Sequence, residues 1–309
     1  MRAVQVGSSK TGPVLLPVEI PQPQPGPDEL LIRVRAAGVT PTEIRWYPTT
    51  HKKDGTMRTG AIPGHEFSGV IAATGKDVSD FRSGQEVYGM NDWFADGATA
   101  EFCLTQSQSI APKPATLTHE AAAAVPIGAL TAWQGLLDRA RLQPGERVLV
   151  HGGAGAVGLF AVQLAHLHGA HVIATGSSRD AEFVTGLGAE KMIDYRSSRF
   201  EDEVQDIDVV FDGVGGETLA RSWSVLKPGG RMVTIAAGGE NVTEQRVKDA
   251  FFIVEPNRQQ LMEIARLLDA GTLKCFVKAS APIEEAEAAY RGEIRYNHGY
   301  GKTVIILPA

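Results

Sequence analysis

A glycine-rich segment that begins at Gly153 has residue types and a spacing suited to binding phosphate groups. It reads GAGAVG and matches the pattern G-x-G-x-x-G. We expect Gly153 to permit a tight turn, Gly155 to let the backbone approach a pyrophosphate, and Gly158 to let the next helix pack closely. The free amides of the turn, Ala156 and Val157 included, would face the phosphates together with the positive end of that helix. The alternative is a turn whose glycines serve packing alone.

The segments on either side of this turn indicate whether it can bind a dinucleotide. Residues 147–151 are mostly apolar, as is typical of a buried parallel strand. Apolar residues recur with a helical period over 159–167, and Gly169 follows where a helix should end. Residues 171–175 form a second strand-like run. A glycine motif between a strand and a helix, with another strand behind it, is the arrangement of a dinucleotide-binding unit.

The end of that second strand indicates which nicotinamide cofactor would bind. A site selective for NADH would carry Asp or Glu there, about 20 residues after the first glycine of the motif. This chain instead has Ser177, Ser178 and Arg179, whose hydroxyl and guanidinium groups can bind a phosphate. We therefore expect NADPH as the cofactor. The same residues can instead, or in addition, cap the next helix, with Asp180 in its first turn.

The composition argues against several classes of partner. The chain has 309 residues, with 30 Lys and Arg against 36 Asp and Glu, so its net charge of −6 disfavours nucleic acid and anionic membranes. No apolar run approaches the ~20 residues that span a bilayer, and we expect no secretory signal at the N-terminus. Only Cys103 and Cys275 occur, so we expect no disulfide framework and a cytoplasmic location, with a single bridge as the alternative.

Two kinds of pattern divide the chain into two domains. Residues 1–118 contain many short strand-like runs separated by Gly and Pro, which indicates a small β-barrel. Strands and helices alternate over 119–270, which indicates an α/β domain with a parallel sheet. The tail, 271–309, returns to strand-like character at 274–277 and 303–307, so we expect it to complete the first domain. In the second domain we expect further strands at 191–194, 208–212 and 231–235. We expect one helix to begin directly after Thr118, which would be its N-cap. Further helices are expected at 127–140, 181–187, 217–226 and 258–270.

Seven stretches, in order along the chain, carry a family resemblance. They are PGHEFSGVI at 63–71, GALTAWQGL at 128–136, PGERVLVHGGAGAVG at 144–158, GLGAEKMIDYR at 186–196, DVVFDGVGGETL at 208–219, LKPGGRMVTI at 226–235 and GKTVIIL at 301–307. Together they are much more specific than one glycine motif. The sequence resembles the zinc-independent, quinone-oxidoreductase-like branch of the medium-chain dehydrogenase/reductase superfamily.

The resemblance implies a fold and an activity. The fold would be a GroES-like β-barrel catalytic domain over 1–118 and 271–309 and a doubly wound Rossmann domain over 119–270, with NADPH in the cleft between them. Members transfer a hydride to a quinone or to the β-carbon of an α,β-unsaturated carbonyl compound, and dimers are common. We therefore expect a homodimeric reductase of a small hydrophobic carbonyl compound or quinone. An enoyl-thioester reductase and a non-catalytic NADPH-binding protein are the alternatives.

The resemblance also implies cofactor contacts outside the glycine turn. Thr131 would lie near the nicotinamide or its ribose, and Tyr195 near the 2′-phosphate. The backbone of Phe252, Ile253 and Val254 would meet the carboxamide. Packing is the alternative role for each of these residues.

Further contacts are expected at strand ends and in the tail. Val214 and Ala236 follow predicted strands, at the edge where open α/β sheets bind ligands, and Ala237 comes next. By resemblance, Asn297 and Lys302 would approach the cofactor from the tail. For these last two, packing or solvation is the preferred interpretation.

The residues at three ligand positions bear on whether a metal takes part. A catalytic zinc needs three protein ligands and one open position. Zinc-dependent members of the superfamily place a ligand where this chain has His65 and a cysteine where it has Thr40. The third position falls near His151, where no cysteine occurs. We expect His65 to be structural and no metal to bind, which favours reduction of a quinone or a conjugated C=C over alcohol oxidation.

The segment 40–47 contains the expected catalytic residues. Hydride addition to an enone places negative charge on the carbonyl oxygen, so a hydrogen-bond donor and a proton source are needed. Relatives in this branch often carry Asn-x-x-Asp here, whereas this chain has Thr40 and Glu43. We select Thr40 and Tyr47 as catalytic candidates, with solvent as an alternative source of the proton.

Three aromatic residues are expected to surround the substrate opening. They are Trp46, Trp93 and Phe94, and they would suit a hydrophobic substrate. A small satellite core under the loop at 91–97 is the alternative.

Overall fold

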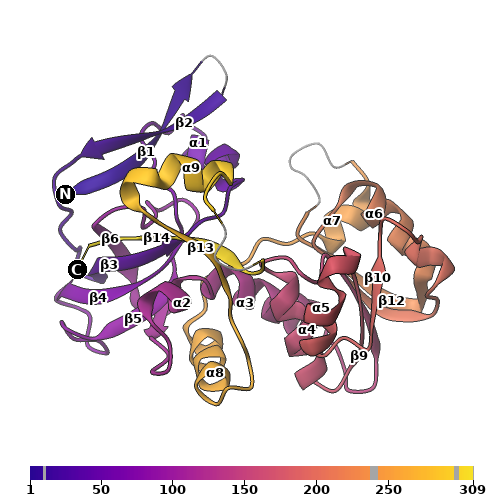
Figure 1. Ribbon diagram of the computed structural model, residues 1–309. Coiled ribbons are helices and arrows are strands. Elements are labelled where there is room, and N and C mark those ends of the chain that lie inside the picture. The colour runs from indigo at the N-terminus through magenta and orange to yellow at the C-terminus, as the bar shows by residue number, and fades with distance from the viewer. Residues whose placement is uncertain (10–11, 237–242, 296–298, 309) are drawn as a thin grey trace. The chain divides into compact units, whose positions relative to one another are not determined.

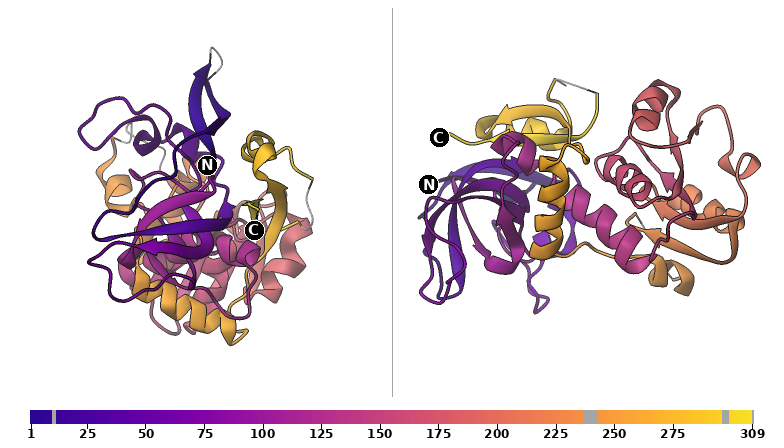
Figure 2. Two further views of the ribbon diagram at one scale, coloured as in Figure 1. Left: turned by 90° about the vertical axis from the view of Figure 1, so that its left-hand side faces the viewer. Right: turned by 90° about the horizontal axis from the view of Figure 1, so that it is seen from below.

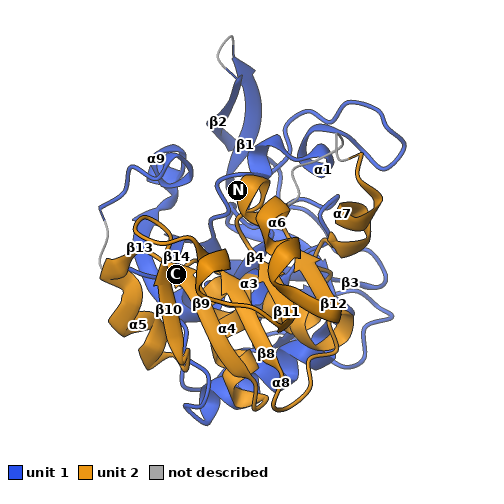
Figure 3. Cartoon of the chain, turned by 90° about the vertical axis from the view of Figure 1, so that its right-hand side faces the viewer, with its two compact units in different colours: residues 1–127, 256–309 blue, residues 128–255 orange. Residues whose placement is uncertain are grey.

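The chain divides into two compact units. The computed structural model describes residues 1–9, 12–236, 243–295 and 299–308. Unit 1 consists of Met1–Ile127 and Pro256–Ala309, and unit 2 of Gly128–Glu255 (Figures 1 and 3). Among the described residues, no helix is long and apolar enough to cross a membrane.

Unit 1 is built on a seven-stranded sheet. Its order is β13-β14-β3-β4-β5-β7, with β6 paired to β3, and a separate hairpin pairs β1 with β2. The strands are β1 (Arg2–Ser9), β2 (Gly12–Glu19), β3 (Glu29–Gly38), β4 (Glu66–Thr74), β5 (Glu86–Met90), β6 (Phe102–Gln106), β7 (Ile110–Pro112), β13 (Val277–Pro282) and β14 (Lys302–Ile306). Leu30, Ile32 and Val34 of β3 are at most 1% exposed, so alternate residues of this strand form the centre of the core.

Three neighbouring strands of this sheet bring distant segments to one end. β3 is antiparallel to both β4 and β14. It ends at Gly38, while its neighbours begin at Glu66 and Lys302. The amide of Val39 extends the pairing by donating to Thr303 O at 2.9 Å. Residues just after β3 therefore lie beside the first residues of β4 and β14.

Unit 2 contains a five-stranded sheet in the order β10-β9-β8-β11-β12, with all pairings parallel. The strands are β8 (Arg147–His151), β9 (His171–Gly176), β10 (Lys191–Asp194), β11 (Ile207–Asp212) and β12 (Leu226–Thr234). Leu149 and Val210 are fully buried, as expected for strands covered on both faces. The strand order reverses between β8 and β11, and open α/β sheets bind ligands at the carboxyl ends of the strands at such a switch point.

Helices connect the strands of unit 2. They are α3 (Pro126–Trp133), which begins in unit 1, α4 (Gly158–Leu167), α5 (Ala181–Gly186), α6 (Gly216–Ser222) and α7 (Gln245–Ala250). α3 continues as a π-helix over Gln134–Arg139. The helices predicted at 127–140, 181–187 and 217–226 are confirmed to within a turn, whereas α7 was not predicted.

Two helices predicted in the dinucleotide-binding domain belong to unit 1 instead. α2 (His119–Ala123) begins after the predicted N-cap, where the Thr118 hydroxyl accepts an amide hydrogen bond at 3.2 Å, and it packs on β3 and β4. α8 (Arg258–Asp269), an orange helix in Figure 2, packs against β7 according to its contacts. Because residues 119–127 and 256–270 contact the sheet of unit 1, the unit boundaries differ from the predicted domain boundaries.

The tail also differs in detail from the prediction. The strand expected at 274–277 is misplaced, because β13 begins to pair with β14 only at Val277. The strand expected at 303–307 is confirmed as β14. Two short helices, α1 (Tyr47–Thr50) and α9 (Ala286–Arg291), were not predicted, since one turn or two give little periodicity to read.

Candidate functional site

The glycine turn follows β8 at the switch point of the unit 2 sheet. The residue of this turn with a left-handed backbone is Gly152, at φ 75°, directly before the motif. Gly153 is needed for another reason, because a Cβ there would lie 2.8 Å from Cβ of Ala174 on the neighbouring strand. Gly158 lies in close contact with the backbone of the turn. A Cβ on it would lie 2.0 Å from Gly152 O, so only glycine lets α4 begin directly against the turn.

The turn presents hydrogen-bond donors suited to an anion. Gly155 is exposed, and α4 begins at Gly158, directly after Ala156 and Val157. The first amides of a helix have no acceptor within the helix, and its N-terminus carries partial positive charge. The turn therefore has the donors and the backbone access that the phosphates of a dinucleotide need.

Asp212 organises the neighbouring strand end and was missed by the sequence analysis. It is fully buried at the end of β11, where Oδ1 accepts from the amides of Val214 and Gly215, each at 3.0 Å. Its Oδ2 accepts from the Thr234 hydroxyl at 2.8 Å, and that hydroxyl accepts from the Ala236 amide at 3.1 Å. The Asp212 carboxylate thus holds Val214 directly and Ala236 through Thr234, and these are the two strand-end residues predicted to contact the cofactor. Ala237, the next predicted contact, lies outside the described residues.

His151 joins β8 to two other elements beneath the turn. Its Nδ1 lies 3.1 Å from the Thr175 hydroxyl, and its Nε2 lies 2.9 Å from the Ser222 hydroxyl. Burial lowers the pKa of His151 to about 4, against an ordinary value of 6.5. The imidazole is therefore neutral near pH 7 and acts as a structural link.

The end of β9 contains the residues predicted to select NADPH. The Asp180 carboxylate accepts from the Ser177 amide at 3.3 Å, so the predicted helix cap is present. Asp180 also lies 3.5 Å from the guanidinium of Arg179, whose side chain is 78% exposed. The Ser177 hydroxyl is buried and has no hydrogen-bond partner among the described residues. The end of β9 thus has an exposed guanidinium group, that of Arg179, and a hydroxyl without a partner, that of Ser177. The Asp180 carboxylate is already hydrogen-bonded within the protein.

A second acid, at the end of β10, is engaged in the same way. Asp194 accepts from the Arg196 amide at 3.0 Å, and this bond, with a further one from Ser178, holds the pKa of the carboxyl below its usual range. Tyr195 is exposed, and its ring lies 5.6 Å from the Arg196 guanidinium. Arg196 was not selected from the sequence, although it immediately follows the predicted Tyr195.

The remaining predicted cofactor residues of unit 2 are mostly buried. Gln134 holds the segment after α7 through paired hydrogen bonds, at 2.8 and 3.1 Å, to the backbone of Glu255. The side chains of Phe252 and Val254 are buried, and the Phe252 amide donates to Thr234 O at 3.2 Å. Thr131 is also buried, within α3.

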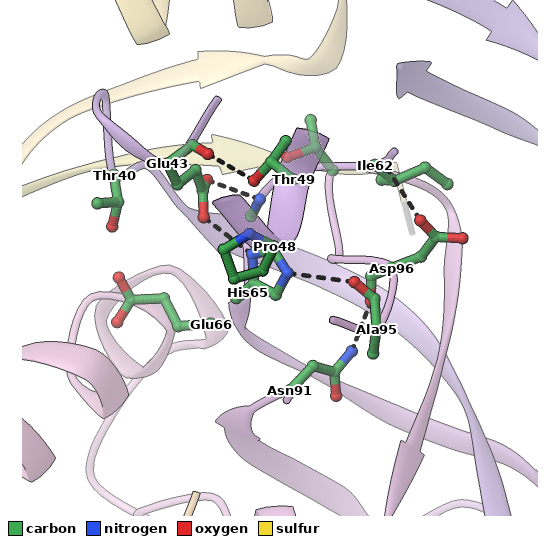
Figure 4. Close-up of polar contacts among 12 residues, drawn as sticks. Thr40, Glu43, Pro48, Thr49, Ile62, His65, Glu66, Asn91, Ala95 and Asp96 are labelled. Atoms are coloured by element: carbon green, nitrogen blue, oxygen red, sulfur yellow. Dashed lines mark hydrogen bonds and ion pairs between the residues drawn. The ribbon is translucent and has the colours of Figure 1, made fainter. Parts of the chain in front are cut away.

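Glu43 is the centre of a buried polar cluster in unit 1 (Figure 4). Its Oε2 lies 3.0 Å from Nδ1 of His65, and its Oε1 accepts from the Tyr290 hydroxyl at 2.6 Å and from the Gly64 amide at 2.8 Å. Burial alone would raise the pKa of Glu43, but these hydrogen bonds and the adjacent His65 outweigh it and lower the pKa overall.

The surroundings of His65 bear on metal binding. Its Nε2 lies 3.2 Å from Ala95 O, so both ring nitrogens face oxygen acceptors (Figure 4). A metal at either ring nitrogen would have to displace the oxygen that this nitrogen contacts. Within the described ranges, no group of three or more His, Cys, Asp or Glu side chains could hold a metal ion.

Thr40 lies beside a buried ion pair that the sequence analysis did not foresee. Lys302 Nζ pairs with Glu66 Oε1 and donates to Thr40 Oγ1 at 3.2 Å. Burial lowers the pKa of Lys302 to about 8, although the charge of Glu43 acts in the opposite direction. Lys302 is a predicted tail position, whereas Asn297, the other one, lies outside the described residues.

The other catalytic and aromatic candidates differ in exposure. Tyr47 is exposed and stacks on His51 with ring centroids 4.4 Å apart. Trp93, expected at an opening, is only 9% exposed and lies 4.9 Å from Trp46 and 5.1 Å from His65 by ring centroids. The low exposure of Trp93 favours the alternative, packing under the loop, for this residue.

Known families and proteins match the chain along its length. The family model for the alcohol dehydrogenase GroES-like domain matches residues 26–115, and the one for zinc-binding dehydrogenase matches 187–305. The quinone oxidoreductase of Rattus norvegicus is 30% identical, over 99% of this chain and 98% of that protein. The 2-methylene-furan-3-one reductase of Solanum lycopersicum is 34% identical, over 82% of this chain and 65% of that protein. The solved structure of the quinone oxidoreductase from Coxiella burnetii is 27% identical, with a TM-score of 0.87 and coverage of 100% and 99%.

The chain therefore belongs to the quinone-oxidoreductase-like branch of the medium-chain dehydrogenase/reductase superfamily. It is an oxidoreductase that combines a GroES-like domain with a Rossmann-like parallel-sheet domain and uses a nicotinamide cofactor. The predicted family, fold class and enzymatic nature are confirmed, and the non-catalytic alternative is removed.

Proposed function

We propose that the protein is an NADPH-dependent reductase that transfers a hydride, without zinc, to a quinone or to the C=C bond of an α,β-unsaturated carbonyl compound. The observation that carries this proposal is the turn from Gly152 to Gly158, which presents backbone donors at the switch point of a parallel sheet. The names of two relatives support the substrate class, since one is a quinone oxidoreductase and the other a reductase of a conjugated ketone.

The preference for NADPH is supported at the ends of β9 and β10. An NADH site needs a carboxylate that is available to the ribose hydroxyls. Here Asp180 and Asp194 are engaged by backbone amides of their own turns. Arg179 is exposed, and the Ser177 hydroxyl lacks a partner, so this edge suits the extra phosphate of NADPH.

The absence of a role for zinc is supported by His65. Its two ring nitrogens contact Glu43 and Ala95, so a metal at either nitrogen would displace one of these contacts. Thr40 replaces the cysteine of the zinc-dependent members and is engaged by Lys302. The residues present do not fit a catalytic zinc, which needs three protein ligands.

The chemistry balances with one cofactor and one proton. When bound, NADPH supplies a hydride, and the substrate also takes up one proton from solvent or from Tyr47. Between the two additions, the carbonyl oxygen of the substrate carries negative charge. Thr40 is the proposed donor to that oxygen, and the exposed Tyr47 is the proposed protein source of the proton.

Isotope transfer tests this function directly. NADPH deuterated at the transferable position of C4 is incubated with the protein, a metal chelator and a panel of enones and quinones. We expect an enone product with one deuterium on its β-carbon, and NADPH consumption by quinones, both unaffected by the chelator. Consumption that requires added zinc, or an enone product without deuterium, would contradict the proposal.

A further inference from the structure

Lys302 places a buried ammonium group next to Thr40. Its side chain is 8% exposed, and Nζ contacts both Glu66 Oε1 and Thr40 Oγ1. Glu66 is fully buried, and its Oε2 accepts from the Ile127 amide at 2.9 Å. Because the carboxylate is held from two sides, it fixes the ammonium, and the ammonium in turn fixes the position of the Thr40 oxygen.

The sheet of unit 1 brings these three side chains together. Thr40 follows β3, while Glu66 and Lys302 begin the two strands that flank β3 in antiparallel orientation. Gly38, the last residue of β3, makes space for this arrangement. A Cβ on Gly38 would lie 2.5 Å from Cγ of Glu66, so a glycine here lets the glutamate side chain lie across the strand end.

The hydrogen bond from Lys302 determines what the Thr40 hydroxyl can do. An ammonium group has donors only, so Thr40 Oγ1 must be the acceptor. The hydroxyl proton of Thr40 then points away from Lys302, and within the described part of the chain no acceptor takes it. Thr40 is also partly exposed, whereas Glu66 and Lys302 are buried. A cation beside the oxygen makes this hydroxyl a stronger donor.

We propose that Lys302 is a positioning residue for the reduction. Held by Glu66, it orients Thr40 so that the hydroxyl proton is presented to the carbonyl oxygen of the substrate, where negative charge develops. This inference rests on the proposed function, and it assigns Lys302 no contact with substrate or cofactor. It differs from the expectation of the family resemblance, in which Lys302 approaches the cofactor itself.

A double-mutant cycle separates these roles. We expect Thr40→Val and Lys302→Met each to lower kcat by at least about tenfold, as for the loss of one donor to a developing oxyanion. The double variant should be no slower than either single variant, because both changes remove the same donor. The KM for the quinone and the Kd for NADPH, measured by fluorescence titration, should stay within about twofold. Thr40→Ser should retain most of kcat.

Two further variants guard against an effect on folding. Lys302→Met leaves the Glu66 carboxylate buried without its partner, which could destabilise the fold. The double variant Lys302→Gln with Glu66→Gln removes both charges and avoids this problem. It should show the same loss in kcat as Lys302→Met. Lys113→Met is the matched control, because Lys113 is also a buried lysine, 7% exposed and 3.4 Å from Glu86. It should leave kcat unchanged.

The possible failures are distinguishable. If Lys302→Met slows the Thr40→Val protein as much as it slows the wild type, or if it weakens NADPH binding tenfold, the positioning role is wrong. If the wild-type protein reduces no quinone or enone at all, the proposed function itself fails.

Discussion

Nδ1 of His65 lies 3.0 Å from Oε2 of Glu43, and neither side chain is more than 2% exposed. Tyr290 of α9 donates to the same carboxylate, so the cluster ties the segment after β3 to the start of β4 and to the tail. In zinc-dependent relatives the position of His65 supplies a ligand. In this chain the imidazole contacts Glu43, which belongs to the segment that carries Thr40 and Tyr47.

The first prediction concerns the stability that this buried pair provides. Glu43→Gln should lower the free energy of unfolding by about 3 kcal/mol, because it removes one charge of a buried network. Glu190→Gln is the matched control, since Glu190 and His171 form an exposed His–Glu pair at 2.7 Å and should cost under about 1 kcal/mol. Urea denaturation measures both values. An equal decrease in the free energy of unfolding for the two variants would show that the Glu43 cluster has no special structural role.

The second prediction concerns pH. Folded His151 stays neutral down to a pKa of about 4, whereas the unfolded chain protonates this residue near 6.5. The unfolded state therefore binds more protons between these values, and stability should fall as the pH falls from 6.5 toward 4, by up to about 1.4 kcal/mol per pH unit from this residue.

The contribution of His151 is isolated by substitution, because carboxylates with lowered pKa values also lose stability in acid. His151→Gln should reduce the dependence of unfolding free energy on pH in this window, and His171→Gln, at an exposed site, should not. An unchanged pH dependence in His151→Gln would mean that the imidazole is not held neutral.

The third prediction concerns the choice of cofactor. Arg179→Ala should raise the KM for NADPH about tenfold and leave the KM for NADH unchanged, because an exposed guanidinium–phosphate pair contributes on the order of 1.4 kcal/mol. Arg199→Ala is the control, as Arg199 is a similarly exposed arginine of unit 2 that pairs with Glu201. Should Arg179→Ala keep the wild-type ratio of the two KM values, the proposed phosphate contact is absent.

The fourth prediction concerns the glycine turn. Gly158→Ala should lower the melting temperature and weaken NADPH binding more than tenfold, because the new methyl group meets the backbone oxygen of Gly152 at 2.0 Å. Gly186→Ala in α5 meets no atom within 4 Å and should raise stability by about 0.5–1 kcal/mol. Normal NADPH affinity in Gly158→Ala would mean that the turn does not need its close contact with α4.

Local patterns in the sequence predicted the parts of the site that lie within one strand–turn–helix segment. The glycine turn and the cap at Ser177 are of this kind, because neighbouring residues specify them. The left-handed backbone at Gly152 was not predicted, because consecutive glycines leave that choice to the path of the chain.

Contacts between distant segments could not be predicted in the same way. The meeting of Thr40, Glu66 and Lys302 depends on the register of β3 with β4 and β14, which no local pattern specifies. The same reason explains why α2 and α8 were assigned to the wrong unit, since their packing partners are far away in the sequence. Asp212 was visible as an acid at the end of a predicted strand, but its bonds to two loops appear only in the fold.

The central claim is that this chain reduces its substrate with NADPH and without zinc. The most direct test is the kcat/KM for NADPH and for NADH with a quinone acceptor, measured on protein freed of metal by a chelator. We predict turnover in the absence of metal and a kcat/KM at least about tenfold higher for NADPH than for NADH. Loss of turnover on metal removal, or an equal or higher kcat/KM for NADH, would contradict the account.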